Sequence, residues 1–536
     1  MKLSQETTAP LTLQASRYCS LSSIPHKRNN IFGSIRETAR FLFIAEQDPT
    51  YIYWSLGIIT FCGLVLRVLV INQPIGYDEA YTFIYFASKP FKFILADYHA
   101  PNNHILNSLL IGMAYRILGD HIWIVRLPAL IASVLALPAV YFMARRFYTS
   151  HQALAASAVL AIYPSLIRAT ANGRGYMLVI LFSFLLANIA GLLVNKQSRT
   201  ALAAYAVIGA LGFYSIPIFL YPMAGISLWV VATYLIGDEP RRIKFTKLTL
   251  FLGACLGGGL LTFLFYSPVI FFGTGLHSII GNDIVAPQTW SNFLDSFNPR
   301  VTKTWADWTA SLSPTIRNLL SGGFLLSLIF YRKASNQKLP MQLFLFLAIA
   351  IVLILQRVIP LPRIWIFLEI FCVVFAVVGL VWLLEILAKI IIRQGHFEKF
   401  FPSTILLFTI VIFISTIVTK QSPEAVAERG KLPEQFAADY LAAHLKPGDT
   451  ILAIAPVDMR TAYYLKIGGV PYDVFYQRDH PAEFQNVLVI IRHREALNTP
   501  EKVVEFFHLL PKLEMTSAEL VYEYGELQIY SIPIIK

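Results

Sequence analysis

Long apolar runs alternate with short polar turns along most of this chain. Runs of about 20 apolar residues, the length that crosses a hydrocarbon core, recur throughout residues 51–419. In a bilayer, such a run satisfies its backbone hydrogen bonds only as a helix. The pattern therefore predicts a polytopic α-helical membrane protein with about 11–13 transmembrane helices. The expected full spans are residues 51–71, 122–143, 152–167, 177–194, 201–216, 218–236, 248–271, 314–331, 341–356, 364–388 and 403–419.

One further apolar run is short and disturbs the alternation of sides. Residues 105–118 follow a polar loop, and the run at residues 122–143 comes directly after them. Arg145 and Arg146 mark the end of the longer run as cytoplasmic, because basic residues stay on that side. If the loop before residue 105 is outside, the two runs cannot both cross. Either residues 105–118 insert partially or at a tilt, or the two arginines are a poor guide to orientation.

The basic turns give the rest of the chain a consistent orientation. They fall on alternate sides of the predicted membrane, which places the N-terminus in the cytoplasm. Residues 72–104, 273–312 and 420–536 are then outside. Residues 79–100 are too polar to span, and we expect them to form helices at the outer interface.

The polar ends of the chain divide it into three regions. Residues 1–48 are typical of a flexible cytoplasmic tail, and residues 49–419 form the transmembrane bundle with its outer loop 72–104 and outer segment 273–312. Residues 420–536 are expected to form a small extracytoplasmic α/β domain. Its pattern predicts an amphipathic helix, two buried strands and a hairpin, at residues 433–445, 450–455, 486–491 and 520–532. No Gly-rich phosphate loop opens its helices, so a structural or acceptor-orienting role is expected.

Composition supports a membrane protein and excludes some functions. Of the 536 residues, 56% are hydrophobic and 14% are charged, against about 25% charged residues in soluble domains. The formal charge of +12 reflects the basic turns and does not indicate a nucleic-acid partner. The four cysteines have neither metal-ligand nor redox spacing. Membrane lipids are expected partners, and a cell membrane, the plasma membrane of a bacterium, is the expected location.

Two adjacent carboxylates, Asp78 and Glu79, follow the first apolar run after a short loop. Acids are favoured at the first turn of a helix, so a helix cap explains the pair most simply when it is taken alone. An ionisable residue at the membrane boundary is also a candidate for function. The other polar residues of the predicted outer face decide between these interpretations.

Basic and aromatic side chains on the same face could complete a site for group transfer. Arg174, Arg357 and Arg363 are placed to bind a phosphate or diphosphate, since a guanidinium group binds phosphate oxygens in pairs. Tyr176 belongs to the same turn as Arg174. A carboxylate such as Asp78 could remove a proton from an acceptor hydroxyl. For any single arginine at a helix end, snorkelling to the interface is the simpler explanation.

The loop before residue 105 is rich in groups that bind metals or sugars. Asp97, His99 and His104 could hold a divalent cation, although their spacing on a Pro-containing loop is not a metal signature. Hydrogen bonding to a sugar or to the acceptor, or stabilisation of the loop, is favoured for His99, Asn102, Asn103 and His104. No other cofactor is indicated.

These motifs together resemble a known family. Tyr-Asp-Glu-Ala at residues 77–80 and His-Ala-Pro-Asn-Asn-His-Ile-Leu-Asn at 99–107 are similar to motifs of the family 39 glycosyltransferases and their bacterial relatives. These are C-type (GT-C) membrane glycosyltransferases, which include the protein O-mannosyltransferases and the lipid A aminoarabinose transferase. Further similar motifs are Leu-Gly-Asp at 118–120, Val-Arg-Leu-Pro at 125–128, the Arg-x-Tyr turn at 172–176 and Pro-Arg at 362–363. The resemblance is best over the first 200 residues, and the 99–107 motif departs from the commoner His-Pro-Pro form.

The resemblance implies a GT-C bundle and a glycosyltransferase that uses a polyprenyl-phosphate-linked sugar on the outer face. Such a donor suits an outward-facing site, because nucleotide sugars stay in the cytoplasm. The implied reaction is an inverting transfer in one displacement. Asp78 would be the base, and Glu79 would position the acceptor or make Asp78 more basic. Arg174 and Arg363, with Arg357 as a third group, would stabilise the departing phosphate. The acceptor hydroxyl on a protein, lipid or glycan stays open.

Two other functions compete with this hypothesis. A transporter or flippase of lipid-linked sugars would normally show internal repeats and polar residues at the membrane midplane. No repeat is visible in the sequence, and the two acids fall in a loop. A scaffold without activity, whose outer domain binds a partner, is the third alternative.

Overall fold

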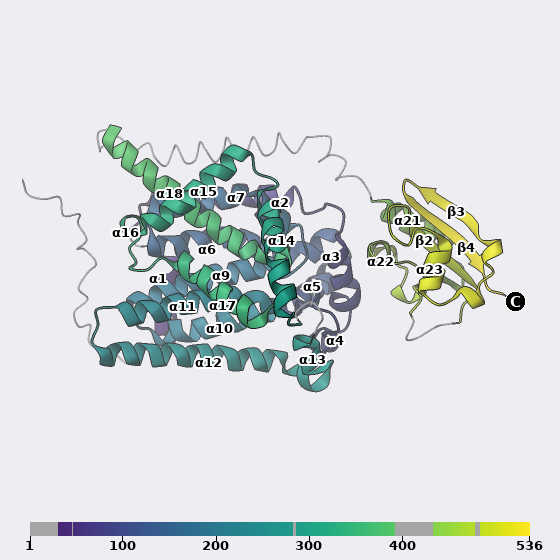
Figure 1. The fold of residues 1–536 in the computed structure, drawn as a ribbon, viewed down its shortest axis with the longest axis horizontal. Coiled ribbons are helices and arrows are strands. Elements are labelled where there is room, and N and C mark those ends of the chain that lie inside the picture. Colours follow the sequence, from purple (N-terminus) through teal and green to yellow (C-terminus); the bar gives the residue numbers. More distant parts are fainter. Residues whose placement is uncertain (1–30, 46, 282–285, 392–431, 478–482, 536) are drawn as a thin grey trace, which may run out of the picture.

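The structure is a computed structural model that describes residues 31–45, 47–281, 286–391, 432–477 and 483–535. The expected span at residues 403–419 and most of the expected N-terminal tail lie outside the described residues. Figure 1 shows a large bundle of helices and a small sheet domain beside one end of it. We call this end of the bundle the domain end.

The bundle consists of helices that follow the apolar pattern of the sequence. Its α-helices are α1 (Ile31–Phe43), α2 (Thr50–Val68), α3 (Tyr77–Thr82), α4 (Phe91–Ala96), α5 (Ile105–Leu118), α6 (Ile122–Phe147), α7 (Ser150–Ile162), α8 (Pro164–Thr170), α9 (Tyr176–Asn195), α10 (Arg199–Ser215), α11 (Leu220–Ile236), α12 (Arg241–Phe272), α13 (Gly275–Ile280), α14 (Trp290–Thr309), α15 (Pro314–Ile329), α16 (Tyr331–Ala334), α17 (Met341–Gln356) and α18 (Ile366–Ile391). Short turns of other helix types are η1 (Phe83–Ala87), η2 (Pro217–Phe219) and η3 (Pro362–Trp365).

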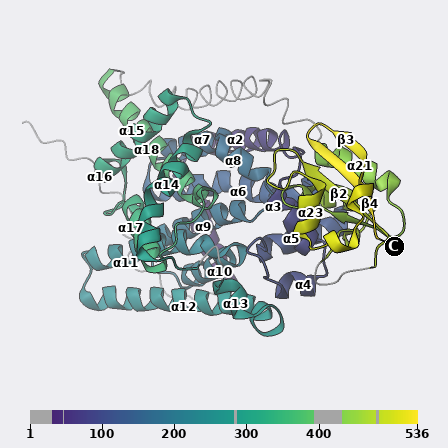
Figure 2. The same cartoon turned by 45° about the vertical axis from the view of Figure 1, so that its right-hand side comes forward.

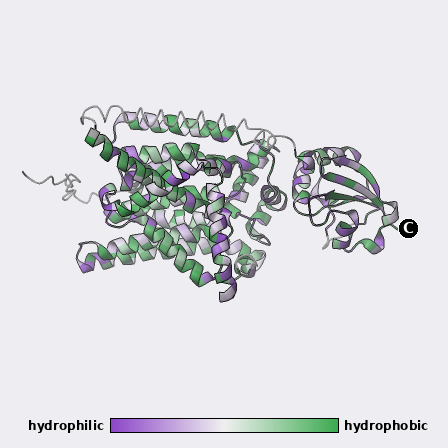
Figure 3. Cartoon of the chain, turned by 45° about the horizontal axis from the view of Figure 1, so that its top comes forward, coloured by the Kyte–Doolittle hydropathy of each residue, from purple (hydrophilic) through white to green (hydrophobic). Residues whose placement is uncertain are grey.

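The helices confirm the predicted polytopic membrane fold. Among the described residues, six helices are long and apolar enough to cross a membrane, and the bent pair α7–α8 makes a seventh span if it counts as one. The expected number of about 11–13 spans also includes shorter helices. Examples are α10 with 17 residues and α15 and α17 with 16 each. Figure 3 shows apolar residues along the bundle helices, with hydrophilic residues at their ends.

A break between α7 and α8 positions the turn that follows α8. Pro164 has no N–H group, which leaves the carbonyl of Leu160 without its helical partner. The buried Arg67 of α2 donates to the carbonyls of Leu160, at 3.3 Å, and Ala161, at 2.9 Å. Arg67 thereby satisfies the broken helix end and holds the bend of 57° between α7 and α8. The turn at residues 171–175 is fixed at the domain end as a result.

Helix α5 packs at the domain end of the bundle. Ile105 at its start packs with Tyr98 and Tyr266 of that end. Ile111, two turns later, packs in a core that it shares with Tyr463 of the C-terminal domain. Residues 105–118 therefore contact the domain end from the start of the helix to its middle, and their partial insertion stays a prediction. Helix α6 then runs the length of the bundle.

The C-terminal domain is a four-stranded sheet with helices on both faces. Its elements are α21 (Pro433–His444), β1 (Asp449–Leu452), α22 (Val457–Ile467), β2 (Asn486–Arg492), α23 (Pro500–Phe506), β3 (Glu519–Tyr524) and β4 (Leu527–Pro533). The strand order is β1-β2-β4-β3, with β1 parallel to β2 and the other pairs antiparallel. Alternate residues of β2 pack against α21 and α22 on one face and against α23 on the other, so the strand is buried throughout. The predicted helix, strands and hairpin are all confirmed.

The C-terminal domain packs directly on α3. Ile75, Ala80 and Phe83 share one apolar core with residues of α22, including Tyr463. The hydroxyl of Tyr464 accepts a hydrogen bond from the backbone N–H of Ile75 at 3.3 Å. Figure 2 shows the domain beside α3 and α5. The segment that carries the two acids therefore lies between the bundle and the C-terminal domain.

Candidate active site

Glu79 points into the protein from the first turn of α3. Its Oε2 accepts the N–H of Gly76 at 2.8 Å, so the side chain caps its own helix. The same carboxylate forms a two-bond ion pair with Arg126 of α6, at 2.8 and 2.9 Å. Both side chains are almost fully buried, with 4% and 2% of their surfaces exposed. Glu79 therefore joins α3 to α6.

The Glu79–Arg126 pair also organises the loops on either side of it. Arg126 donates to the carbonyls of Ile71 and Gln73, at 2.8 and 2.7 Å, and so fixes the chain between α2 and α3. Glu79 Oε1 accepts the N–H of Gly173 at 2.5 Å, which ties the turn after α8 to α3. One buried ion pair thus sets the positions of three segments.

Asp78 points away from this pair, towards two other arginines. Its Oδ2 accepts hydrogen bonds from Arg174 at 2.6 Å and from Arg363 at 2.8 Å. Its Oδ1 accepts one longer bond, of 3.4 Å, from the amide of Asn102. The Asp78 side chain keeps 27% of its surface exposed. The two adjacent acids therefore face different partners, and Asp78 is the accessible one.

Arg174 is buried and held on several sides. Its Nη2 donates to Oδ1 of Asn102 at 3.0 Å, and its guanidinium group lies 5.2 Å from the ring centre of Tyr176. Its Nε has no hydrogen-bond partner among the described residues. Arg363, on η3, has half of its side-chain surface exposed. Arg174 is thus fixed in the interior, whereas Arg363 reaches Asp78 from the surface.

His104 supports Arg174 as a neutral ring. Its Nδ1 accepts the N–H of Gly175 at 2.9 Å, and its Nε2 lies 3.4 Å from Arg174 Nη2. Burial lowers the pKa of His104 well below its usual value, and the charges of Arg174 and Arg363 lower it further. The imidazole is therefore uncharged at neutral pH and adds no repulsion to the two arginines.

The structure brings together some of the expected residues and separates others. Asp78, Asn102, Arg174 and Arg363 form one hydrogen-bonded group, and His104 and Tyr176 flank Arg174. Arg357 instead lies over the ring of Trp290, at 5.8 Å. The buried amide of Asn103 donates to the carbonyls of Ile94 and Asp97, at 3.0 and 2.6 Å, and so stabilises the end of α4.

The three candidate metal ligands do not meet. Asp97 and His99 are hydrogen-bonded to each other at 2.7 Å, and His99 Nε2 lies 3.0 Å from the hydroxyl of Tyr81. Both ring nitrogens of His104 face Arg174 and Gly175 instead. Across the described ranges, no group of three or more His, Cys, Asp or Glu residues could hold a metal ion. Burial would raise the pKa of Asp97, but hydrogen bonds from His99 outweigh it and lower that pKa.

Two comparisons with known proteins found similar sequences and structures. Residues 101–272, which include Arg126 and Arg174, match the family model described as dolichyl-phosphate-mannose-protein mannosyltransferase. The chain has the GT-C glycosyltransferase fold. Its structure is similar to the crystal structure of ArnT from Cupriavidus metallidurans bound to undecaprenyl phosphate, with a TM-score of 0.58 and 12% identity over 88% of this chain and 97% of that one. The apo state of ArnT gives 0.55 and 12% identity over 90% and 98%. No curated protein matches the chain in sequence.

The turn that carries Arg174 has no room for a side chain at Gly173. A Cβ atom added at Gly173 would lie 2.8 Å from Val125 Cγ1, 3.0 Å from the Val125 carbonyl and 3.3 Å from Glu79 Oε1. A larger residue would push the turn away from Glu79. Close approach of the backbone is therefore the reason for glycine at this position.

Arg126 is the site residue whose partner the sequence did not reveal. It lies within the Val-Arg-Leu-Pro motif of a predicted span. A charged side chain inside a membrane span needs a partner, so the position of Arg126 indicated that a buried acid contacts it. The sequence gave no means of choosing Glu79 over Asp78 as that partner. Asn107 was likewise not singled out, although its amide donates to the carbonyl of Gly173 at 2.8 Å.

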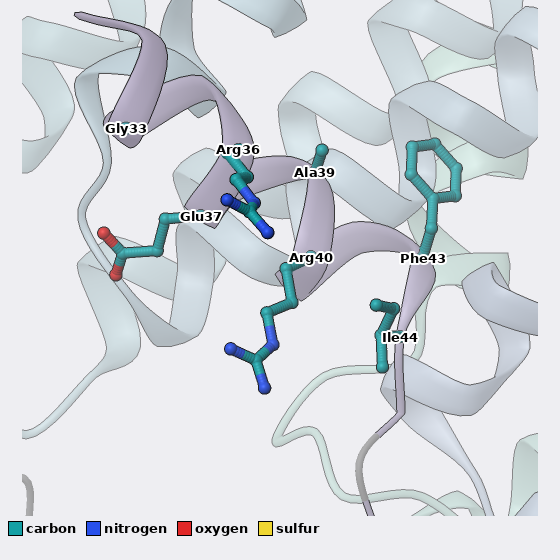
Figure 4. A pocket seen from close by; sticks show the side chains of 7 residues that line it. All are labelled: Gly33, Arg36, Glu37, Ala39, Arg40, Phe43 and Ile44. Carbon is teal, nitrogen blue, oxygen red and sulfur yellow. The ribbon is translucent and has the colours of Figure 1, made fainter. Parts of the chain in front are cut away.

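The cavity shown in Figure 4 is at the other end of the bundle. It measures about 790 Å³ and is lined by Gly33, Arg36, Glu37, Ala39, Arg40, Phe43 and Ile44 of α1 and the residue after it. Helix α1 packs near the end of α9, where Lys196 pairs with Glu37. Tyr176 begins α9 at the domain end. This cavity is therefore separate from the Asp78 group.

The C-terminal domain contributes an acid, Asp458, to the surface next to α3. Burial raises the pKa of Asp458 to about 6 from its usual 3.8, despite hydrogen bonds from backbone N–H groups. Its Oδ1 has no hydrogen-bond partner within the described part of the chain. Because the folded protein favours the protonated form, the contribution of this group to stability is present at low pH. It is lost as the pH rises from about 4 to about 6.

Asp458→Asn is accordingly expected to raise the unfolding temperature of the full chain at pH 7 and to leave it nearly unchanged at pH 4. Thermal unfolding in detergent at the two pH values measures this. The exposed Asp473 of the same domain, changed to Asn, is the control for a lost negative charge. A lower unfolding temperature of Asp458→Asn at pH 7 would contradict the expectation.

Proposed function

We propose that this chain is a membrane glycosyltransferase that transfers a sugar from a polyprenyl-phosphate-linked donor to an acceptor hydroxyl on the outer face of the membrane. The observation that carries the proposal is the convergence of Asp78, Arg174 and Arg363, which come from α3, the turn after α8 and η3. A base and two phosphate-binding groups are the components that such a transfer needs.

The fold supports a lipid-linked donor. ArnT, whose structure is similar over most of both chains, was crystallised with undecaprenyl phosphate. The matching family model carries the name of a dolichyl-phosphate-linked sugar. Both names refer to a sugar carrier of the polyprenyl-phosphate class.

The proposed reaction is a single displacement with inversion. Asp78 takes the proton of the acceptor hydroxyl while the acceptor oxygen forms the new bond to the anomeric carbon. The bond between that carbon and the phosphate oxygen breaks, and its electron pair stays on the phosphate. Arg174 and Arg363 stabilise the charge that develops there. Asp78 Oδ1, which accepts only the 3.4 Å bond from Asn102, is the oxygen best placed to take the proton.

The supporting residues take distinct roles in this proposal. Glu79 holds α3 in place through Arg126 and has no oxygen left for an acceptor. The ring of Tyr176 lies beside the guanidinium group of Arg174, and His104 fixes the turn that carries Arg174 by accepting the N–H of Gly175. Asn102 contacts Asp78, where an acceptor would approach, and we assign the partly exposed His99, which contacts Tyr81 of α3, to acceptor or sugar binding as well. The acceptor is a hydroxyl of a protein, lipid or glycan.

The charge distribution supports a site on the outer face. Helix α6 ends away from the domain end with Arg145 and Arg146, and α12 begins with Arg241 and Arg242. Basic residues of short loops stay in the cytoplasm. We therefore place the N-terminus in the cytoplasm and the C-terminal domain outside, in a multi-pass protein of the cell membrane, the plasma membrane of a bacterium.

Arg363→Gln tests the phosphate-binding part of the proposal. We expect it to lower kcat/KM for transfer about 100-fold, because the leaving phosphate loses one guanidinium group. The side chain is half exposed, so the variant should fold. Initial rates with a polyprenyl-phosphate sugar in membranes measure the effect.

Arg357→Gln is the matched control for Arg363→Gln. It removes a positive charge from the same segment between α17 and α18, but the guanidinium group of Arg357 lies over Trp290 instead of facing Asp78. We expect transfer to change less than about threefold, because Arg357 is half-buried against Trp290 and a surface charge away from the reacting groups contributes little. Equal losses in the two variants would contradict the assignment of Arg363.

A further inference from the structure

The Asp78 carboxylate binds the same two guanidinium groups that the proposed function assigns to the donor phosphate. One oxygen, Oδ2, accepts from both Arg174 and Arg363, at 2.6 and 2.8 Å. These bonds are as short as charge-assisted hydrogen bonds become. A base in this position is held by the groups that should stabilise the leaving phosphate.

We propose that the donor phosphate and Asp78 compete for Arg174 and Arg363, so that donor binding releases Asp78 to act as the base. The inference rests on the proposed function and adds an order to the reaction, in which the donor binds before the base acts. Acceptor deprotonation follows donor binding, because the Asp78 carboxylate is free to turn to the acceptor hydroxyl only when the arginines have turned to the phosphate.

The electrostatics of the group favour such an exchange. A single carboxylate holds both arginines here, and guanidinium groups bind phosphate oxygens as readily as carboxylate oxygens. A phosphodiester has two non-bridging oxygens, one for each guanidinium group, whereas Asp78 offers both of them a single oxygen. The guanidinium fork of arginine fits pairs of phosphate oxygens as well as it fits a carboxylate. Phosphate can therefore replace Asp78 without leaving either arginine unpaired.

The surroundings allow Asp78 to leave without a change in the backbone. Glu79, the next residue, is fixed by its buried pair with Arg126, which anchors the first turn of α3. Arg174 keeps its bond of 3.0 Å to Asn102 after the exchange. A rotation of the Asp78 side chain and a small shift of the half-exposed Arg363 are enough.

The binding of farnesyl phosphate to the purified full-length chain in detergent tests the inference. Competition predicts that Asp78→Asn binds this probe about tenfold more tightly than the unchanged protein, a coupling of ordinary size between two ligands. A simple phosphate-binding role of Asp78, or a role in holding the arginines in place, predicts equal or weaker binding. Farnesol, which lacks the phosphate, should bind all variants alike.

Asn102→Asp provides the opposite change. It keeps an acceptor for Arg174 but adds a second carboxylate at the group, so farnesyl phosphate should bind about tenfold more weakly by the same coupling. Asp120→Asn removes an exposed acid near the start of α6 and is expected to change the affinity little. Monodisperse gel filtration of each variant shows that it is folded.

The outcomes separate this inference from the proposed function. Tighter binding by Asp78→Asn together with weaker binding by Asn102→Asp supports the competition. Unchanged or weaker binding by a folded Asp78→Asn, or no binding of the probe to any variant, overturns it. The transfer rates of Arg363→Gln and Arg357→Gln test the proposed function separately and do not depend on the direction of these affinity changes.

Discussion

Asp78→Asn is expected to reduce sugar transfer at least about 1,000-fold, within the range for loss of a general base. The amide has nearly the same shape as the carboxylate but cannot take the proton of the acceptor hydroxyl. Membranes that contain equal amounts of each variant, supplied with a polyprenyl-phosphate sugar, give the rates directly. The variant protein should still accumulate, because Asp78 is partly exposed and is not part of the buried pair.

Asp120→Asn serves as the control for the loss of one acid at the domain end. It should transfer at the normal rate, because Asp120 is exposed and contacts none of the residues around Asp78 in the described structure. Full activity of Asp78→Asn would remove the basis for Asp78 as the base. Loss of activity in both variants would point to a general effect of charge.

Arg126→Met is expected to have the largest effect on folding. It leaves the buried carboxylate of Glu79 without its cation, and breaking a buried pair in this way costs about 3–5 kcal/mol. The carbonyls of Ile71 and Gln73 also lose their donor. We expect little folded protein, measured by fluorescence-detected gel filtration after heating.

The double variant Glu79→Gln/Arg126→Met separates the effect of an unpaired buried charge from the effect of a changed side-chain size at residue 126. Removing both charges takes away the uncompensated carboxylate, so the double variant should be more stable than Arg126→Met alone. If the single variant is as stable as the unchanged protein, Glu79 and Arg126 do not anchor α3. Retained folding with lost activity would then suggest a direct role of Glu79 in the reaction.

Together the variants assign different tasks to two adjacent acids. The sequence predicted that the pair matters and that Asp78 is the base, but it left the task of Glu79 open. Successive residues of a helix point about 100° apart, so one acid of a pair can face the core while the other faces a cleft. Which acid faces which way depends on Arg126, Arg174 and Arg363, which lie 47–285 residues further along the chain.

The limits of the sequence are clearest at the loop before α5. Asp97, His99 and His104 are close in sequence, which made a shared metal site conceivable. In the structure, Asn103 fixes the end of α4, and His104 points towards Gly175. Proximity in sequence does not give the direction of side chains on an irregular loop. The association of Arg174 and Arg363 with Asp78 agrees with the prediction that all three residues share one side of the membrane. The same prediction included Arg357, which lies over Trp290 instead.

The fold was more predictable than the site because hydrophobic pattern and length decide most of it. Helices lie at every predicted span within the described residues, and the C-terminal strands agree within a few residues. Hydropathy reports whether a segment prefers lipid but not how deep it lies. The position of α5 at the domain end therefore had to come from its contacts with Tyr98 and with the C-terminal domain.

The most direct test of the account uses the purified chain in liposomes that contain a polyprenyl-phosphate sugar and a hydroxyl acceptor. We expect a new glycosidic product and an equal amount of free polyprenyl phosphate, with neither formed by Asp78→Asn. Mass spectrometry of the lipids and of the acceptor measures both. Movement of the intact donor across the bilayer without any glycosidic product would contradict the account and would indicate a flippase of lipid-linked sugars.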